Sequence, residues 1–250
     1  MSQYTLGLVS VSFRGHTPKE ILEAACAAGL TCIEWGSDVH ALCTDLARLD
    51  EIAEMQRTYG ISCSSYGTYF KFGKTPMEEL PDYIAAAKRL GTNVLRLWCG
   101  RKSGAETSEA EYAELLAQCK RAAALAEQHD VVLCLECHQK TFTERCEDAM
   151  RLMRDVKSPC FRMYWQPFAE RSESENLTYA RAIAPNVEHL HVFHWKGEHK
   201  LPLSEAIGEW SSYLGAFSGP RTLLLEFMPH DTLEELATEV AALKRIIGGN

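Results

Sequence analysis

Short apolar segments alternate with longer amphipathic segments along the whole chain. Eight of the short segments are predicted to be strands: Thr5–Phe13, Cys32–Gly36, Ile61–Gly67, Val94–Gly100, Val131–His138, Arg162–Pro167, Glu188–Trp195 and Thr222–Met228. The longer segments have the apolar spacing of helices that pack on a sheet: Pro18–Ala28, Asp45–Tyr59, Met77–Leu90, Ser108–Gln128, Cys146–Val156, Glu175–Ile183, Glu205–Phe217 and Thr232–Ile247. A strand therefore begins about every 30 residues, which is the size of one βα unit.

Eight βα units with nearly all-apolar strands favour a closed parallel barrel over an open sheet. An open doubly wound sheet that binds a nucleotide has a glycine-rich turn after its first strand, and Ser12–His16 does not have that pattern. The chain has 250 residues, a usual size for one barrel, and no Pro/Gly/Ser-rich linker separates its units. We therefore expect an α/β protein that forms a single (β/α)8 TIM barrel domain over residues 1–250.

The charge and hydropathy of the chain exclude several partners. It has 26 Lys and Arg residues against 34 Asp and Glu residues, a net charge of −8. Nucleic-acid binding needs a basic surface, so we expect no nucleic acid as a partner. No run approaches the roughly 18 apolar residues of a membrane span. The start, Met1–Gly7, lacks the layout of a signal peptide, so we expect a cytoplasmic protein without a membrane partner.

Ten cysteines are spread from Cys26 to Cys160 through predicted helices and strands. This distribution favours reduced, buried thiols over a disulfide scaffold. The one C-x-x-C pair, Cys134 and Cys137, lies in a predicted strand, where side chains three positions apart point to opposite faces. We therefore expect neither a redox pair nor a zinc site at this pair.

Polar side chains gather at the carboxyl ends of the predicted strands, where an α/β barrel places its active site. They end or follow six of the eight strands: Glu34, Asp38, His40, Arg96, Trp98, Glu136, His138, Gln166, His189, His191 and Glu226. Side chains alternate between the two faces of a strand, which puts Glu136 and Glu226 on the inner face of the barrel. His189 and His191 share one face of their strand.

Three of these residues, Glu136, His191 and Glu226, can converge at one rim of the barrel from neighbouring strands. Gln166 lies between them in strand order. Carboxylate and imidazole ligands suit a divalent cation that keeps open positions for a substrate. The pattern therefore predicts a metal site.

A different interpretation of the same residues needs no metal. Arg96 can pair with Glu136 or with Glu34, which would give a buried ion pair. His138 and His189 fit three roles: orienting a metal ligand, contacting a substrate, or filling the core.

The tryptophans and the loop cations carry weaker predictions. Trp98 shares the face of Arg96, so it can form an apolar wall for a sugar at the rim. We expect Trp35, Trp165 and Trp195 to pack between barrel and helices. Loop cations can meet an anionic substrate but are more often solvated, and five of them follow strands one, three and four: Arg14, Lys71, Lys74, Arg101 and Lys102.

Five segments carry a resemblance to a known family: Ile33–His40, Ser65–Tyr69, Arg96–Gly100, Leu135–His138 and Tyr164–Pro167. They resemble the sugar phosphate isomerase/epimerase group within the xylose-isomerase-like TIM barrel superfamily. The resemblance spans essentially the whole chain. The same barrel hosts isomerases, epimerases, dehydratases and an endonuclease, so the fold alone does not give the substrate.

The resemblance implies one divalent metal ion, which is Mn, Mg, Zn or Co. The metal-dependent sugar isomerases and epimerases of the superfamily hold it with Glu, Asp, His and Glu after strands five to eight. Glu136, His191 and Glu226 match this pattern. Gln166 stands where the family has Asp, and its amide oxygen can bind a metal but brings no charge.

The resemblance also implies an isomerase or epimerase that acts on a sugar or sugar phosphate. A base removes a proton next to the carbonyl, and the metal stabilises the enediolate. Glu136 and Glu226 are expected to ligate the ion and to act as an acid/base pair, with His138 as a proton shuttle. Two bases on opposite faces would epimerise, and one base would isomerise. Substrate contacts are expected from the other polar residues: Glu34, His40, Arg96, Trp98 and His189.

Three alternatives stay open. A non-catalytic sugar-binding barrel with incomplete metal ligation would account for Gln166. A lyase or dehydratase on the same fold would use a similar site. An endonuclease would need further His and Asp ligands and a basic face, which the net charge of −8 disfavours. The assembly state, monomer or homo-oligomer, is left open as well.

Overall fold

The computed structural model describes residues 3–248, and it confirms the predicted α/β barrel. Parallel strands close the barrel in the order β1-β10-β7-β6-β5-β4-β3-β2. Their bounds are Tyr4–Val9 (β1), Cys32–Gly36 (β2), Ser62–Phe72 (β3), Val94–Cys99 (β4), Val132–Glu136 (β5), Phe161–Trp165 (β6), Val187–Val192 (β7) and Arg221–Leu225 (β10). Because every pairing is parallel, the carboxyl ends of these strands meet at one rim.

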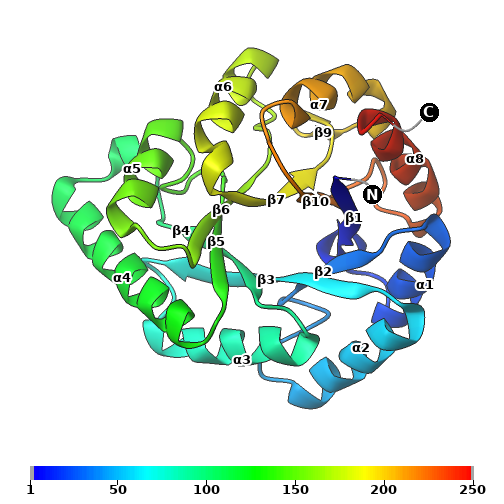
Figure 1. The fold of residues 1–250 in the computed structure, drawn as a ribbon, viewed down its shortest axis with the longest axis horizontal. Helices are drawn as coiled ribbons and strands as arrows, with labels where there is room; N and C mark the ends of the chain where they lie inside the picture. The colour runs from blue at the N-terminus through cyan, green and yellow to red at the C-terminus, as the bar shows by residue number, and fades with distance from the viewer. Residues whose placement is uncertain (1–2, 249–250) are drawn as a thin grey trace.

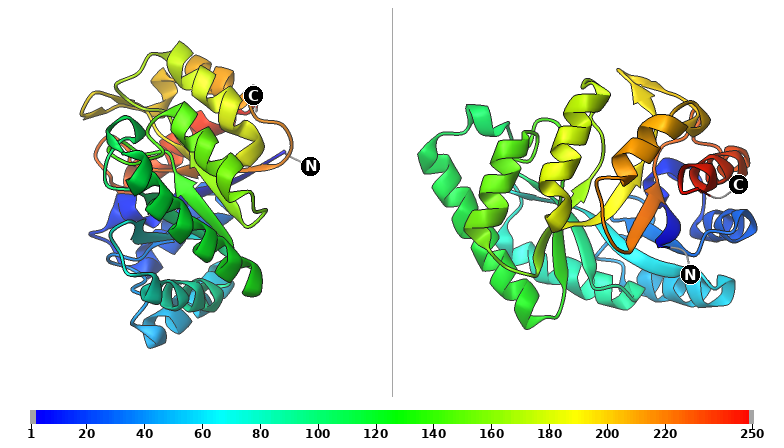
Figure 2. Two further views of the ribbon diagram at one scale, coloured as in Figure 1. Left: turned by 90° about the vertical axis from the view of Figure 1, so that its left-hand side faces the viewer. Right: turned by 45° about the horizontal axis from the view of Figure 1, so that its top comes forward.

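The α-helices form a ring around the barrel, and α8 closes it by packing beside α1 (Figure 1). Figure 2 shows the same outer layer from two further directions. The helices are Pro18–Ala28 (α1), Leu46–Tyr59 (α2), Leu80–Leu90 (α3), Glu109–Gln128 (α4), Cys146–Val156 (α5), Glu173–Ile183 (α6), Ile207–Leu214 (α7) and Leu236–Ile246 (α8). Within residues 3–248, no helix is both long enough and apolar enough to cross a bilayer.

The ends of α1 illustrate how local sequence sets the helix bounds. The Thr17 hydroxyl accepts from the Glu20 N–H, and the Glu20 carboxylate accepts from the Thr17 N–H, which forms a capping box. Pro18 occupies the first turn, where its missing N–H has no cost. Gly29 ends the helix in the left-handed conformation, with φ of 76°.

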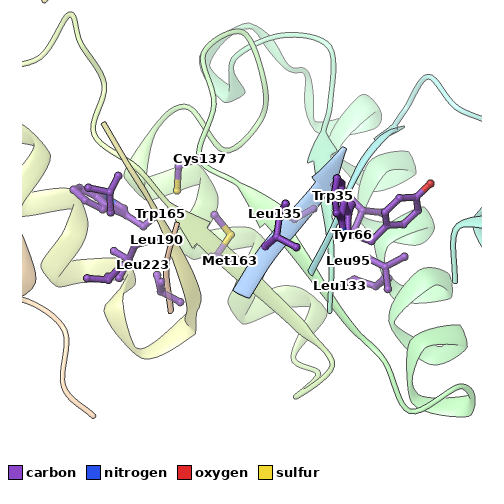
Figure 3. Close-up of a cluster of buried hydrophobic side chains, with 14 of the residues drawn as sticks. Trp35, Tyr66, Leu95, Leu133, Leu135, Cys137, Met163, Trp165, Leu190 and Leu223 are labelled. Atoms are coloured by element: carbon purple, nitrogen blue, oxygen red, sulfur yellow. The ribbon is translucent and has the colours of Figure 1, made fainter. Parts of the chain in front are cut away.

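Side chains from the strands form two separate apolar layers, as the alternation predicts. Leu133, Leu135 and Leu223 point away from the barrel axis and pack in the layer between strands and helices (Figure 3). Cys137 belongs to this outer layer, whereas Cys134 belongs to the smaller cluster inside the barrel. The two cysteines of the C-x-x-C pair therefore lie in different layers. All ten cysteines of the chain are free thiols.

Several predicted strands end earlier than expected: the sixth ends at Trp165 and the eighth at Leu225. In β1 and β5, buried side chains replace the ladder at the strand end. β1 stops at Val9, and Ser10–Phe13 forms a 3₁₀ helix (η1). The Ser10 hydroxyl accepts from the Gly36 N–H, and the Ser12 hydroxyl accepts from the Phe227 N–H. β5 stops at Glu136, whose carbonyl accepts from the Thr143 hydroxyl.

The predicted seventh strand is also too long, because the chain turns after Val192. Beyond that turn, an antiparallel hairpin that the sequence did not predict is formed by Trp195–Lys196 (β8) and His199–Lys200 (β9). Five further 3₁₀ helices lie in connections: Met77–Glu79 (η2), Gly104–Glu106 (η3), Ala184–Asn186 (η4), Leu203–Glu205 (η5) and Leu233–Glu235 (η6). The hairpin extends the loops that surround the carboxyl-end rim.

Candidate metal centre and active site

Three buried side chains meet at the carboxyl-end rim, as predicted. Glu136 ends β5, His191 lies in β7, and Glu226 directly follows β10. Each offers one ligand atom, and these atoms all lie within 4.8 Å of one another. The three residues are only 3%, 0% and 6% exposed. Charged groups are seldom buried this deeply without a partner, so the cluster requires an explanation.

The Nδ1 atom of His191 lies at the centre of this cluster. It is 3.2 Å from Oε2 of Glu226 and 3.5 Å from Oε1 of Glu136. Gln166 follows β6, and its Oε1 atom lies 3.2 Å from the same nitrogen. A ring nitrogen carries at most one proton, so it can donate to only one of these three oxygens.

The same four atoms are a suitable donor set for a divalent ion. They are three oxygens and one imidazole nitrogen, a combination that hard and borderline cations bind. Burial alone would lower the pKa of His191, but the carboxylates of Glu226 and Glu34 raise it well above its ordinary value. A cation at Nδ1 would take the place of that proton and would leave the imidazole neutral.

A buried ion-pair network lies under the cluster and links two of its members. Nε of Arg96 donates to Oε1 of Glu34 at 2.9 Å, and Nη1 donates to Oε2 of Glu136 at 2.7 Å. The Ser65 hydroxyl donates to Oε2 of Glu34, which also lies 3.4 Å from Nε2 of His191. Burial would raise the pKa of Glu34, but Arg96 and His191 lower it to about 2. The ion pair and the convergent ligand set therefore coexist.

The two glutamates of the cluster have unequal surroundings. Oε2 of Glu136 accepts from both Nη1 of Arg96 and Nε1 of Trp98. Burial would raise the pKa of this carboxyl, but Arg96 and His191 lower it strongly. Within residues 3–248, the carboxylate of Glu226 has His191 as its side-chain partner and receives no further donor. Glu136 is therefore fixed, and Glu226 is the freer carboxylate.

A cavity of about 410 Å³ opens above the cluster. Six predicted site residues line it: Arg96, Trp98, Glu136, His138, Gln166 and Glu226. His138 is partly exposed, and its ring lies 4.9 Å from the ring of Trp98. Its Nδ1 lies 2.8 Å from the carbonyl oxygen of Gln139. Three predicted metal ligands (Glu136, Gln166 and Glu226) and the predicted shuttle His138 therefore share one cavity, whereas the fourth ligand, His191, is fully buried and does not line it.

Three predicted substrate contacts do not line this cavity. Glu34 is fully buried in the network below it. The two ring nitrogens of His40 lie 3.2 Å from the Ser10 hydroxyl and 3.1 Å from the His16 carbonyl oxygen. His189 is buried inside the barrel, with Nε2 3.4 Å from a backbone carbonyl. The alternation of side chains along the strand predicted correctly which face His189 occupies, but it did not predict how deep in the barrel the residue lies.

Other lining residues were missed. Trp195 was expected to pack between barrel and helices, as Trp35 and Trp165 do, but it begins the β8–β9 hairpin and lines the cavity. Phe227 also lines the cavity and has φ of 55°, an unusual value for a residue other than glycine. Tyr69 lies in β3, which runs beyond its predicted end. Each of these three residues is an aromatic side chain close to the end of a predicted strand, and that position could have marked it in the sequence as a cavity-lining residue.

Comparisons with known proteins agree with this architecture. The sequence profile of the xylose isomerase-like TIM barrel family matches residues 22–242. No curated protein matches the sequence. The structure is similar to the probable 3-DHS dehydratase AsbF from Bacillus anthracis, which is involved in petrobactin synthesis, with 18% identity and a TM-score of 0.78 over 96% of this chain and 98% of that chain.

Two further solved structures share the fold. One is a xylose isomerase-like TIM barrel protein from Mycobacterium smegmatis in complex with magnesium, at 14% identity and a TM-score of 0.70 over 99% and 98% of the two chains. The other is D-psicose 3-epimerase with D-tagatose from Clostridium cellulolyticum, at 11% identity and a TM-score of 0.66 over 98% of each chain. At these identities the likeness establishes the barrel and leaves the chemistry to be argued from the residues.

Proposed function

The chain belongs to the xylose isomerase-like TIM barrel family, and from this premise we propose that it is a metal-dependent isomerase of a sugar or related hydroxyketone. The observation that carries the proposal is the convergence of three oxygens, from the cavity-lining residues Glu136, Gln166 and Glu226, on Nδ1 of the buried His191. Four residues would hold the ion: Glu136, Gln166, His191 and Glu226. A divalent ion bound there would polarise a substrate carbonyl and stabilise the enediolate formed by loss of a neighbouring proton.

Glu226 is the residue that we assign as the base. Its carboxylate lies at the cavity floor and has an oxygen that no other donor occupies in the described part of the chain. It can therefore take a proton from the substrate carbon and return it. Oε2 of Glu136 already accepts from Arg96 and Trp98, so this oxygen is not free to do the same. One base acting on one face favours isomerisation over epimerisation.

His138 is assigned to move a proton between substrate oxygens. Its Nδ1 faces the carbonyl oxygen of Gln139 at 2.8 Å, so the proton is placed on Nδ1 and Nε2 is left as the second functional atom. The ring is held against Trp98 at the cavity wall. This position leaves the imidazole accessible to a substrate bound over the metal ligands.

Exchange of substrate C–H for deuterium in heavy water tests the proposal. We expect the metal-loaded protein to exchange the proton next to the carbonyl in at least one member of a panel of ketoses and aldoses. Glu226→Gln should abolish this exchange, with a circular dichroism spectrum like that of the wild type. Glu114→Gln is the matched control, because Glu114 is exposed on α4. Exchange that survives in Glu226→Gln would remove its role as base.

A dehydratase is the second candidate, because the single free base is equally suited to elimination. Removal of the same proton followed by loss of a β-hydroxyl group would give an enone. Absorbance of the enone and release of water would distinguish this reaction from isomerisation, which conserves the atoms of the substrate. A non-catalytic sugar-binding barrel would bind a sugar and show neither exchange nor elimination.

A further inference from the structure

Some of the charged residues that line the cavity form ion pairs, and others do not. Besides Glu136 and Glu226, four charged residues line it: two arginines and two glutamates, Arg14, Arg96, Glu170 and Glu198. Both arginines have carboxylate partners, but the two additional glutamates have none among residues 3–248. The lining charges that lack a partner are therefore both negative.

The three nitrogens of the Arg14 guanidinium all donate hydrogen bonds within the protein. Its Nε donates to Oδ2 of Asp38 at 2.5 Å, its Nη2 donates to the Tyr69 hydroxyl at 2.5 Å, and its Nη1 donates to the Val11 carbonyl at 3.1 Å. The Tyr69 hydroxyl donates to the same oxygen of Asp38 at 3.1 Å. This closed cluster neutralises the guanidinium at the cavity wall. Arg96 is similarly enclosed between two glutamates.

Glu170 and Glu198 lie on two different loops that line the cavity. Glu170 follows β6, and Glu198 lies in the turn of the β8–β9 hairpin. Both side chains are exposed, and within the described chain neither makes an ion pair or a hydrogen bond through its carboxylate. Three aromatic side chains line the same cavity: Phe168, Phe193 and Trp195. A sugar ring fits against such a wall, whereas an anion would meet two like charges.

Three of the predicted loop cations, Lys71, Lys74 and Arg101, are not among the residues that line the cavity. Lys71 places its Nζ 4.4 Å from the ring centroid of Trp98, so its charge is directed at the indole. Burial and the nearby Lys74 and Arg101 lower the pKa of Lys71, although the carboxylate of Glu136 opposes this shift. The three cations do not provide an anion site within the cavity.

We propose that the substrate is an uncharged polyhydroxy ketone or aldose of monosaccharide size, and that Glu170 and Glu198 exclude phosphorylated and carboxylated analogues. This inference rests on the proposed function and names its substrate class. Specificity here comes from repulsion of the wrong substrate, in addition to attraction of the right one. A divalent ion would be balanced by Glu136 and Glu226, while Glu34 balances Arg96, so the two loop glutamates would remain as unbalanced negative charge among the lining residues.

Matched pairs of a free ketose and its terminal phosphate ester test the proposal. Binding to the metal-loaded chain is followed by tryptophan fluorescence, since Trp98 and Trp195 line the cavity. We expect the free ketose to bind at least about tenfold more tightly than its ester. Added salt should reduce this preference by screening the exposed glutamates. Tighter binding of the ester, equal binding of the pair, or binding of neither compound would overturn the inference.

Variants separate this inference from the proposed function. The double variant Glu170→Gln/Glu198→Gln should reduce the preference for the free ketose by about tenfold. Glu114→Gln, which removes the same charge from the outer surface of α4, should leave the preference unchanged. An unchanged preference in the double variant would overturn the role of the two glutamates. Discrimination in binding without any C–H exchange would contradict the proposed isomerase and leave the substrate class standing.

Discussion

Gln166 determines how much negative charge faces the candidate metal ion. It stands between Glu136 and His191 in strand order, and its Oε1 lies 3.2 Å from Nδ1 of His191. A carboxylate at the same place would add one negative charge within direct contact of a cation. The present site, with two carboxylates, would balance a divalent ion without excess.

We predict that Gln166→Asp binds Mn²⁺ about tenfold more tightly than the wild type, which corresponds to about 1.4 kcal/mol. Isothermal titration of the metal-free protein measures the difference. Gln166→Leu is the matched control and should bind more weakly, because it lacks the oxygen. Equal affinities in all three proteins would show that Gln166 does not contact the ion.

At the residue scale, the sequence predicted which side chains meet but not how they pair. Strand period and strand order are enough to bring Glu136, His191 and Glu226 to one rim. The two-sided pairing of Arg96 with Glu34 and Glu136 depends on side-chain conformation and depth, which no pattern in the sequence reports. Consequently Glu34 was expected at the substrate and instead lies below it.

At the scale of elements, β3 passes unusually close to the buried ion pair. A Cβ atom added at Gly67 would lie 2.6 Å from Oε1 of Glu34 and 2.8 Å from Nη2 of Arg96. Both groups are held by hydrogen bonds, so neither can move without loss. This close approach explains why glycine occupies the middle of a strand that is otherwise well packed.

We predict that Gly67→Ala lowers the free energy of unfolding by about 1 to 3 kcal/mol. Gly208→Ala on α7 is the control, since nothing lies within 4 Å of its added Cβ atom. In a helix that change should raise the free energy of unfolding by about 0.5 to 1 kcal/mol. Urea unfolding measures both. A Gly67→Ala protein as stable as the wild type would contradict the described packing.

Element boundaries were the least predictable part of the fold. The largely aromatic segment Val192–Trp195 gave no sign that the strand ends and a hairpin begins. The end of β1 depends on Ser10 and Ser12 bonding to the backbone of distant strands. Such contacts exist only once the barrel has closed, so local sequence does not encode them.

At the scale of the whole molecule, the buried His40 couples stability to pH. Burial lowers the pKa of His40 below its ordinary value of 6.5, although its bond to the His16 carbonyl opposes this shift. The folded state therefore binds this proton less readily than the unfolded state. The stabilising contribution is full above pH 6.5 and is lost as the pH falls through the lower, folded-state pKa.

We predict that the wild type loses stability on acidification below pH 6.5 more steeply than His40→Gln does. Urea unfolding at a series of pH values compares the two proteins. His129→Gln serves as a second comparison, because His129 lies at the end of α4 outside the barrel. If the two slopes below pH 6.5 are the same for the wild type and His40→Gln, His40 is not the group responsible.

The central claim is that Glu136, Gln166, His191 and Glu226 hold one divalent ion, and metal content tests it most directly. The protein is purified without chelators and measured by elemental analysis, beside a His191→Ala variant and a Glu114→Gln control. We expect one equivalent of Mn, Mg, Zn or Co in the wild type and the control, and none in His191→Ala. Metal-free wild-type protein that also fails to take up any of these ions when they are supplied would contradict the account.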